Sequence, residues 1–138
     1  MTASRPSLRD LLEAREHDDS PGLLADGTRL TWREYVAASR GRASALAGLL
    51  GAARPPHVGV LLDNTPEMAL QLAAAGWGAH VLVGLNTTRR GASLLADARK
   101  ADVQVIVTDD THRGLLDGLD LTGIRVLDGD DLSGSPQA

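Results

Sequence analysis

The sequence predicts an α/β fold: a parallel sheet of about four strands flanked by helices, preceded by a small N-terminal helix and a β-hairpin. The length of 138 residues suffices for one domain with a buried core, but not for two ordinary domains. Short runs rich in β-branched residues alternate with helical segments at intervals of roughly twenty residues, which is typical of a parallel sheet. Three of these runs are apolar at nearly every position, as in strands covered on both faces.

Composition and charge exclude several classes of function. The net charge is -4, from 14 basic and 18 acidic residues spread along the chain. We therefore expect no nucleic-acid partner, because such partners require a clustered basic surface. The sequence has no cysteine, no apolar run long enough to span a bilayer and no signal-peptide pattern at its start. These features predict a cytoplasmic protein without integral membrane association.

The first two expected elements are a short helix and a hairpin. Leucines recur at helical spacing within 7–17, behind Ser7, whose hydroxyl can cap the helix. The segment 21–32 has two short apolar pieces around Asp26-Gly27, a dipeptide suited to the positive φ angles of a tight turn. A two-stranded ribbon is therefore expected after the helix.

The longest expected helix follows this hairpin. Thr31 and Glu34 stand three residues apart, as in a capping box, and the glycine and prolines of 51–56 end the helical pattern. Its apolar face comprises Trp32, Tyr35, Val36, Ala43, Leu46, Ala47 and Leu50. Its charged residues are expected to lie mostly off that face: Arg33, Glu34, Arg40 and Arg42.

The second half of the chain predicts the sheet. The expected strands are 57–62, 80–85, 103–108 and 124–127, and the expected helices are 66–76, 89–100 and 112–118. Thr65 can cap the first of these helices, which Pro66 opens, since proline is tolerated where its missing N–H would be unpaired. Gly76 or Gly78 can end it in a left-handed turn.

Few residues in the sequence are candidates for chemistry. The loop Asn86 to Gly91 lies between a predicted strand and a predicted helix, and its arginines and hydroxyls offer groups for an anion. Exposed arginines at a helix start are more often solvated surface, and neither a Walker pattern nor GxGxxG occurs. Four histidines are too scattered to share a metal, so no metal site is expected: His17, His57, His80 and His112.

Two acidic pairs follow predicted strands, where ligands of open α/β sheets tend to bind. They are Asp109-Asp110 and Asp130-Asp131, and the favoured interpretation is that they form turns and helix caps. No serine lies in a GxSxG turn; three lie within predicted helices: Ser39, Ser44 and Ser93. The sequence therefore predicts no catalytic residue in this chain.

Two stretches resemble core motifs of the adenylate-forming (AMP-binding) superfamily, which contains acyl-CoA synthetases and peptide-synthetase adenylation domains. The stretch "LTWREY" resembles the first motif, with Leu30, Thr31 and Glu34 matching. Trp32 stands where the family usually has tyrosine, and Tyr35 where it has leucine.

The stretch "AAAGWGAHVLVGLN" resembles the second motif. Val83, Leu85 and Asn86 match it, Gly84 replaces a proline, and the family's glycine falls on Ala79. The segment "GLNTTRRGASLL" is most similar to fatty-acid-CoA ligases of the actinobacterial type, and the resemblance extends over roughly 5–132. It identifies the chain as the N-terminal part of such an acyl-CoA synthetase.

The resemblance implies an ATP-dependent reaction in which a carboxylate forms an acyl-adenylate and CoA then displaces AMP, with Mg²⁺ as the metal. The family's phosphate loop and C-terminal lysine are absent from this sequence, so no cofactor is expected in this chain and it is expected to be inactive alone. Arg113, in the loop after the third predicted strand, is the one candidate for cofactor binding, on the CoA side; a solvated surface arginine is the favoured alternative.

The resemblance also predicts the organisation of the chain. Residues 1–132 are expected to be an incomplete N-terminal subdomain of the ligase large domain, from a truncated gene product, a split gene or an excised segment, with 133–138 as a disordered tail. Its expected partner is the remainder of the ligase, or a second copy, through exposed apolar surface.

Two other hypotheses stay open. One is a self-contained α/β binding or regulatory module with Asp109 and Asp110 as a ligand or phosphoacceptor corner. A receiver-type domain would need a lysine after a late strand, whereas the single lysine, Lys100, lies in a predicted helix before the third strand. The other is a regulatory paralogue that has lost catalysis. The acyl substrate is also left open.

Overall fold

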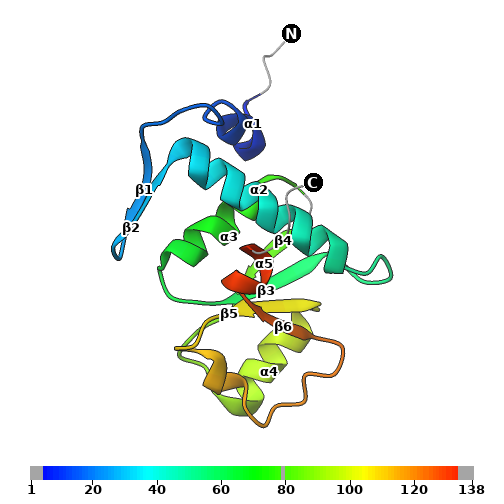
Figure 1. Ribbon diagram of the computed structural model, residues 1–138. Helices are drawn as coiled ribbons and strands as arrows, with labels where there is room; N and C mark the ends of the chain where they lie inside the picture. The colour runs from blue at the N-terminus through cyan, green and yellow to red at the C-terminus, as the bar shows by residue number, and fades with distance from the viewer. Residues whose placement is uncertain (1–4, 79, 134–138) are drawn as a thin grey trace.

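A helix and hairpin precede a parallel sheet that carries helices on both faces (Figure 1). The computed structural model describes residues 5–78 and 80–133. The elements in chain order are α1 (Leu8–Glu13), β1 (Pro21–Ala25), β2 (Thr28–Thr31), α2 (Trp32–Leu49), β3 (His57–Leu61), α3 (Pro66–Gly76), β4 (Val81–Gly84), α4 (Gly91–Lys100), β5 (Val105–Thr108), the 3₁₀ helix η1 (Arg113–Leu116), β6 (Arg125–Asp128) and α5 (Gly129–Ser133). The tail predicted at 133–138 lies outside the described residues, except for Ser133. Within the described ranges, no helix is both long and apolar enough to cross a bilayer.

The N-terminal helix and hairpin form as predicted, although α1 is shorter than the expected span. Ser7 accepts a hydrogen bond from the N–H of Asp10, whose carboxylate accepts one from the N–H of Ser7, so a capping box starts the helix. β1 and β2 pair antiparallel. Asp26 and Gly27 turn the chain at φ 50° and 79°, the positive values that this dipeptide tolerates.

Helix α2 starts at the predicted capping box, and its predicted apolar face is buried or half-buried except at one position. Thr31 accepts from the N–H of Glu34 at 3.1 Å, and the Glu34 carboxylate accepts from the N–H of Thr31 at 2.9 Å. Two expectations were wrong: Ala47 is exposed, and Arg42 is buried at 7% exposure. Arg42 is buried because it pairs with Glu67 of α3, which packs against α2.

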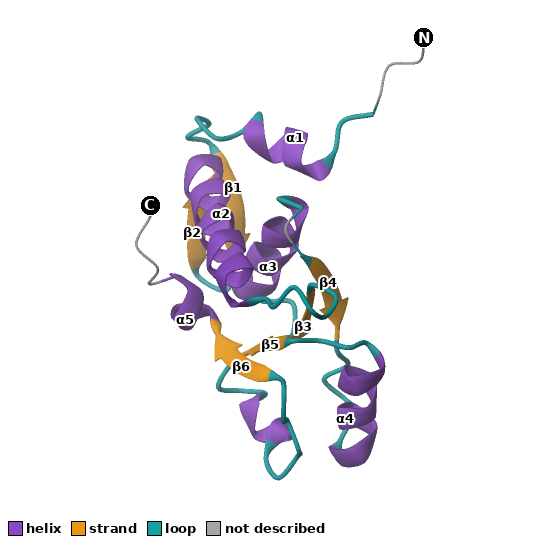
Figure 2. Cartoon of the chain, turned by 90° about the vertical axis from the view of Figure 1, so that its right-hand side faces the viewer, coloured by secondary structure: helices purple, strands orange, loops and turns teal. Residues whose placement is uncertain are grey.

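The four predicted strands form one parallel sheet in the order β4-β3-β5-β6. Figures 1 and 2 show α2 and α3 on one side of this sheet and α4 on the other. The last expected helix, over 112–118, is only the 3₁₀ helix η1. It is short because the chain already turns at Gly118, with φ 76°.

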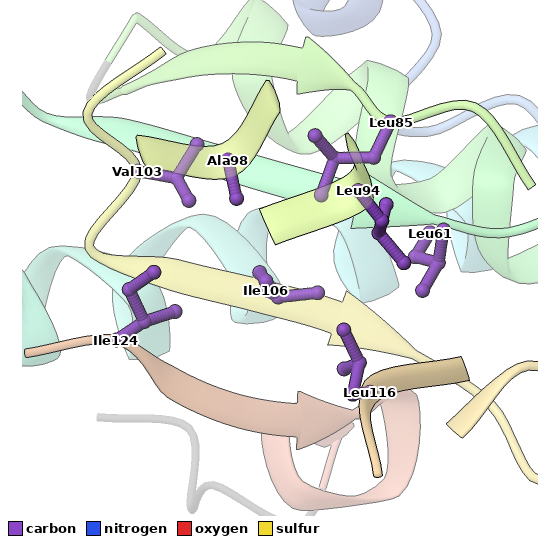
Figure 3. Close-up of a cluster of buried hydrophobic side chains, with 8 residues drawn as sticks. All are labelled: Leu61, Leu85, Leu94, Ala98, Val103, Ile106, Leu116 and Ile124. Atoms are coloured by element: carbon purple, nitrogen blue, oxygen red, sulfur yellow. The ribbon is translucent and has the colours of Figure 1, made fainter. Parts of the chain in front are cut away.

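The core lies in two layers, one on each face of the sheet. Ile106 of β5 packs with Leu94 and Ala98 of α4 on one face, in the cluster that Figure 3 shows. Its neighbours Val105 and Val107 pack on the other face, in the cluster that contains Leu46 of α2. This alternation follows from the period of two of a strand and explains why β5 is apolar throughout.

A third cluster joins α1, α2 and α3 around Trp77. The indole N–H of Trp77 donates to the hydroxyl of Ser39 at 3.0 Å, and the Arg40 guanidinium lies 4.3 Å from the ring centroid. The hydroxyl of Tyr35 donates to the carbonyl of Ala69 at 2.7 Å. Ser39, one of the three serines predicted to lie within helices, is therefore a buried residue of the core.

His80 is buried just before β4. Neither of its ring nitrogens has a hydrogen-bond partner among the described residues, and burial lowers the pKa of its imidazole below the ordinary 6.5. The unfolded chain therefore binds a proton at a higher pH than the folded chain does. The free energy of unfolding should fall as the pH drops below about 6.5, by up to about 1.4 kcal/mol per pH unit.

The variant His80→Leu tests this expectation, because it fills the site without a titratable group. Urea unfolding at pH 7.5 and pH 5 should show a smaller loss of stability on acidification in the variant than in the original chain. An equal loss in both proteins would show that His80 is not the source.

Candidate functional site

The carboxyl edge of the sheet has the topology of a ligand site. β4 lies on one side of β3 and β5 on the other, so the strand order reverses direction between β3 and β5. In open α/β sheets, ligands bind outside the carboxyl ends of the strands at such a switch point. The polar residues that follow β3 and β5 are therefore the first candidates for a site.

These residues converge on His112, in the turn after β5. Its Nδ1 lies 2.7 Å from Asp109 Oδ1, and its Nε2 lies 3.2 Å from Asp63 Oδ2. Asp63 follows β3, and its other carboxylate oxygen accepts from the Thr87 hydroxyl at 3.3 Å. The imidazole is buried, with its side chain 10% exposed, whereas the Asp63 side chain is 64% exposed. We call Thr87, Asp63, His112 and Asp109 the edge cluster.

Arg113 lies next to the edge cluster, at the start of η1, and it is exposed. Its guanidinium pairs with Asp128 of β6 at 3.1 Å. The backbone N–H of Asp131, which donates to the Asp128 carboxylate, holds the pKa of that carboxyl below its usual range, and the charge of Arg113 lowers it further. Arg113, the candidate for cofactor binding, is thus an exposed cation that pairs with a carboxylate in this structure.

The acidic pairs lie at the same edge and have different partners. Asp109 accepts from the backbone N–H and contacts the ring of His112, so it organises the turn, as the favoured interpretation expected. Asp131 and Asp128 exchange hydrogen bonds at the start of α5. A cavity of about 190 Å³ lies here, lined by Glu67, Thr108, Asp109, Asp110, Asp128, Gly129 and Asp130.

Glu67, which lines this cavity, forms a largely buried ion pair with Arg42. The Arg42 guanidinium binds the Glu67 carboxylate through two contacts, of 2.7 and 2.8 Å, and Gln71 donates to the same carboxylate at 2.8 Å. A Cβ at position 129 would overlap that carboxylate, so a larger residue there would displace the Glu67 side chain from this position. Sequence reasoning missed this network, because neither the helical period nor any motif distinguishes Arg42 from the exposed arginines of α2.

The loop Asn86 to Gly91 uses its polar groups internally. Asn86 accepts from the backbone N–H and the hydroxyl of Thr88, at 2.8 and 2.7 Å. Arg89 pairs with Asp97 of α4 at 3.0 Å, and Arg90 donates to the carbonyl oxygens of Thr87 and Arg89. Both guanidiniums are therefore engaged in the fold.

The other histidines lie apart from this edge. His17 is exposed, His57 contacts the carbonyl of Ala101 through Nδ1 at 2.7 Å, and His80 lies before β4. In the part of the chain that the structure describes, no three histidine or acidic side chains are arranged to hold a metal ion. Ser44 and Ser93 lie on α2 and α4, where they are exposed.

Solved structures share the arrangement of this fold. A putative long-chain-fatty-acid CoA ligase from Rhodopseudomonas palustris superimposes with a TM-score of 0.78 and 20% identity, over 96% of this chain and 37% of that chain. The N-terminal subdomain of NpsA from Klebsiella oxytoca superimposes with a TM-score of 0.71 and 19% identity, over 94% of this chain and 31% of that chain. The fold is therefore one found in adenylate-forming enzymes.

The family follows from the sequence match. The family model for AMP-binding enzymes matches residues 12–135, and this chain belongs to that family. It is 41% identical over 108 residues to the medium/long-chain-fatty-acid–CoA ligase FadD17 of Mycobacterium tuberculosis, covering 78% of this chain and 22% of the relative. It is 42% identical over 121 residues to the steroid-22-oyl-CoA synthetase of Rhodococcus jostii, covering 88% of this chain and 22% of the relative. The chain thus spans about a fifth of the length of these curated relatives.

Proposed function

We propose that this chain supplies the N-terminal subdomain of an ATP-dependent fatty-acid–CoA ligase. In the proposed reaction, a fatty-acid carboxylate attacks the α-phosphorus of ATP and releases pyrophosphate, and the thiol of CoA then displaces AMP. The observation that carries the proposal is the identity of 41–42% with two actinobacterial acyl-CoA ligases, whose names specify CoA thioester formation.

The described residues do not fit a Mg²⁺–ATP site. No three carboxylates or histidines among them are placed to share a cation, and the sequence holds neither a Walker pattern nor a Ser/Thr/Gly-rich loop ending in Pro-Lys. ATP and Mg²⁺ are therefore proposed to bind the remainder of the ligase and not this chain. Its proposed contribution is structural: a rigid sheet and its carboxyl edge.

Arg113 is the proposed contact to CoA. It is exposed at the carboxyl edge of the sheet, where ligands of such sheets bind, and a guanidinium suits a phosphate group. Asp128 pairs with it in this chain, so an anion would have to compete with that carboxylate.

The proposed partner is the remaining polypeptide of the ligase. Leu8 and Leu11 of α1 and Leu72 of α3 are 49%, 54% and 52% exposed. Leu8 packs over Gly76, one helical turn after Leu72, so these leucines form one apolar area across α1 and α3. Burying such an area removes apolar surface from water, which favours association with a further part of the enzyme.

A chimaera tests the proposal. The 108 residues of FadD17 that align with this chain are replaced by the corresponding residues of this chain. The chimaera should catalyse ATP–pyrophosphate exchange that depends on a fatty acid, because the rest of FadD17 supplies the chemistry. The 138-residue chain alone should show none.

Two results would overturn the proposal. Fatty-acid-dependent exchange by the isolated chain would show that it carries its own catalytic site. A folded chimaera without exchange, beside an active FadD17, would show that this chain does not serve as the ligase subdomain.

A further inference from the structure

The parallel sheet has two lateral edges, formed by its outer strands β4 and β6. Figure 2 shows these strands at opposite ends of the sheet. The outer side of an edge strand presents backbone N–H and C=O groups that a further strand can bind. Stable monomers protect such edges with charged side chains, prolines, bulges or covering elements. The two edges of this sheet differ in that protection.

The lateral edge at β6 is protected. The N–H of Arg125 donates to the carbonyl of Gln104 on the β5 side, at 3.0 Å, so the alternate residues Val126 and Asp128 turn their backbone groups outward. The N–H of Asp128 already donates to the Asp131 carboxylate at 2.9 Å. The strand also carries a charge at each end, at Arg125 and Asp128. A further strand would therefore meet charges and an occupied donor at this edge.

The lateral edge at β4 has open backbone groups. The N–H groups of Val81 and Leu85 donate to backbone carbonyls on the β3 side, at 2.8 and 2.9 Å. Because successive residues of a strand alternate in direction, the backbone groups of Leu82 and Gly84 turn outward. Among the described residues, these outward groups have no hydrogen-bond partner. The strand therefore offers its backbone to a further strand.

The side chains of β4 also leave this edge open. Its sequence, VLVG, contains no charged residue and no proline, and its pairing with β3 has no bulge. Val81 is 51% exposed. Gly84 is exposed, and a Cβ at this position would meet nothing within 4 Å. The residues of β4 therefore supply none of the usual protections against pairing.

The open edge is complementary to itself. When two copies of β4 lie antiparallel about Val83, Leu82 of each copy faces Gly84 of the other, and each facing pair can exchange both N–H···O bonds. The glycine leaves room for the facing leucine, since the space beside it is empty. Val83 faces its own copy across the axis, as an apolar cross-strand pair. No like charges meet, because β4 carries none.

We propose that two copies of this chain associate by antiparallel pairing of their β4 strands, with the two-fold axis at Val83. The sheet then continues from one copy into the other, and the same surface is used on both sides, as in other two-fold dimers. The surface differs from the leucines of α1 and α3 that are proposed to meet the rest of the ligase. The inference does not depend on the proposed ligase function.

Disulfide cross-linking tests the position of the axis. The 138-residue chain has no cysteine, so Val83→Cys introduces a single thiol. Side chains that face each other across a non-hydrogen-bonded antiparallel pair lie close enough for a disulfide. Oxidised glutathione should therefore convert the Val83→Cys variant to a covalent dimer on a non-reducing gel. The matched control is Val126→Cys, at a half-buried valine of the other edge strand, which should stay monomeric.

Sedimentation equilibrium over about a hundredfold range of concentration tests the pairing itself. Gly84→Pro removes the outward N–H, and proline is tolerated on an edge strand where its nitrogen faces outward. This variant should raise the dimer dissociation constant at least about tenfold, because each copy loses one donor to the other. Gly84→Ala keeps the N–H and should leave the constant nearly unchanged.

Several results would overturn the proposal. One is a monomer at every concentration of the original chain, and another is equal cross-linking of Val83→Cys and Val126→Cys. A dimer that persists in Gly84→Pro but is lost in Leu72→Ser would place the contact on α3 instead. Cross-linking through Val83→Cys tests the interface even if Gly84→Pro does not fold.

Discussion

Replacing Arg42 with alanine is expected to lower the free energy of unfolding by about 3 kcal/mol, because it leaves the Glu67 carboxylate largely buried without its cation. The side chains of Arg42 and Glu67 are only 8% and 20% exposed, and two contacts of 2.7 and 2.8 Å join them. Gln71 would remain as a neutral donor to that carboxylate. Urea unfolding at neutral pH measures the loss.

An exposed ion pair provides the matched control. Arg89 and Asp97 pair at 3.0 Å, but their side chains are 46% and 38% exposed. Water solvates the remaining carboxylate in Arg89→Ala, so the urea midpoint should hardly change. Equal losses in Arg42→Ala and Arg89→Ala would show that burial does not set the cost of breaking the pair.

Truncating Ile106 to alanine is expected to cost about 3 kcal/mol, within the range for large-to-small changes in a core. Ile106 of β5 is 0% exposed, and its side chain packs against α4 within the cluster of Figure 3. The control is Val81→Ala at a position that is 51% exposed, where the change should be within about 0.5 kcal/mol. A small loss from Ile106→Ala would mean that the surrounding side chains close the cavity.

The sheet could be predicted because strand signals are local. The expected strands 57–62 and 103–108 overlap β3 and β5 to within two residues at each end. Helix starts could be predicted equally well, since the caps Thr31 and Thr65 lie within three residues of the N–H groups that they bind. Propensity and capping act over a few residues, so the sequence alone displays them.

The family could also be predicted from short motifs. The stretches around Thr31 and Asn86 carried the resemblance, and the match of residues 12–135 to AMP-binding enzymes confirms it. The prediction of the last helix was less accurate, because the pattern over 112–118 does not separate one 3₁₀ turn from an α-helix.

The candidate site was only partly visible in the sequence. Asp109 and Arg113 could be located at the carboxyl edge, because each follows a predicted strand. The pairing of Arg113 with Asp128 could not be predicted, because Asp128 lies on another strand. Nor could the contact between His112 and Asp63, because the strand order sets the place of β3 beside β5. The sequence shows which residues follow strands, but it does not show which strands are neighbours in the sheet.

The amino-acid pattern determined the helices, the strands, their caps and the family, because each depends on residues close together in the chain or on a motif of a few residues. The tertiary structure alone decided that Arg42 is buried and that His112 lies between two carboxylates. Arg42 and Glu67 are 25 residues apart in sequence. Such contacts exist only once the crossover helices have placed α2 against α3 and β3 beside β5, since the charge of a side chain does not specify its partner.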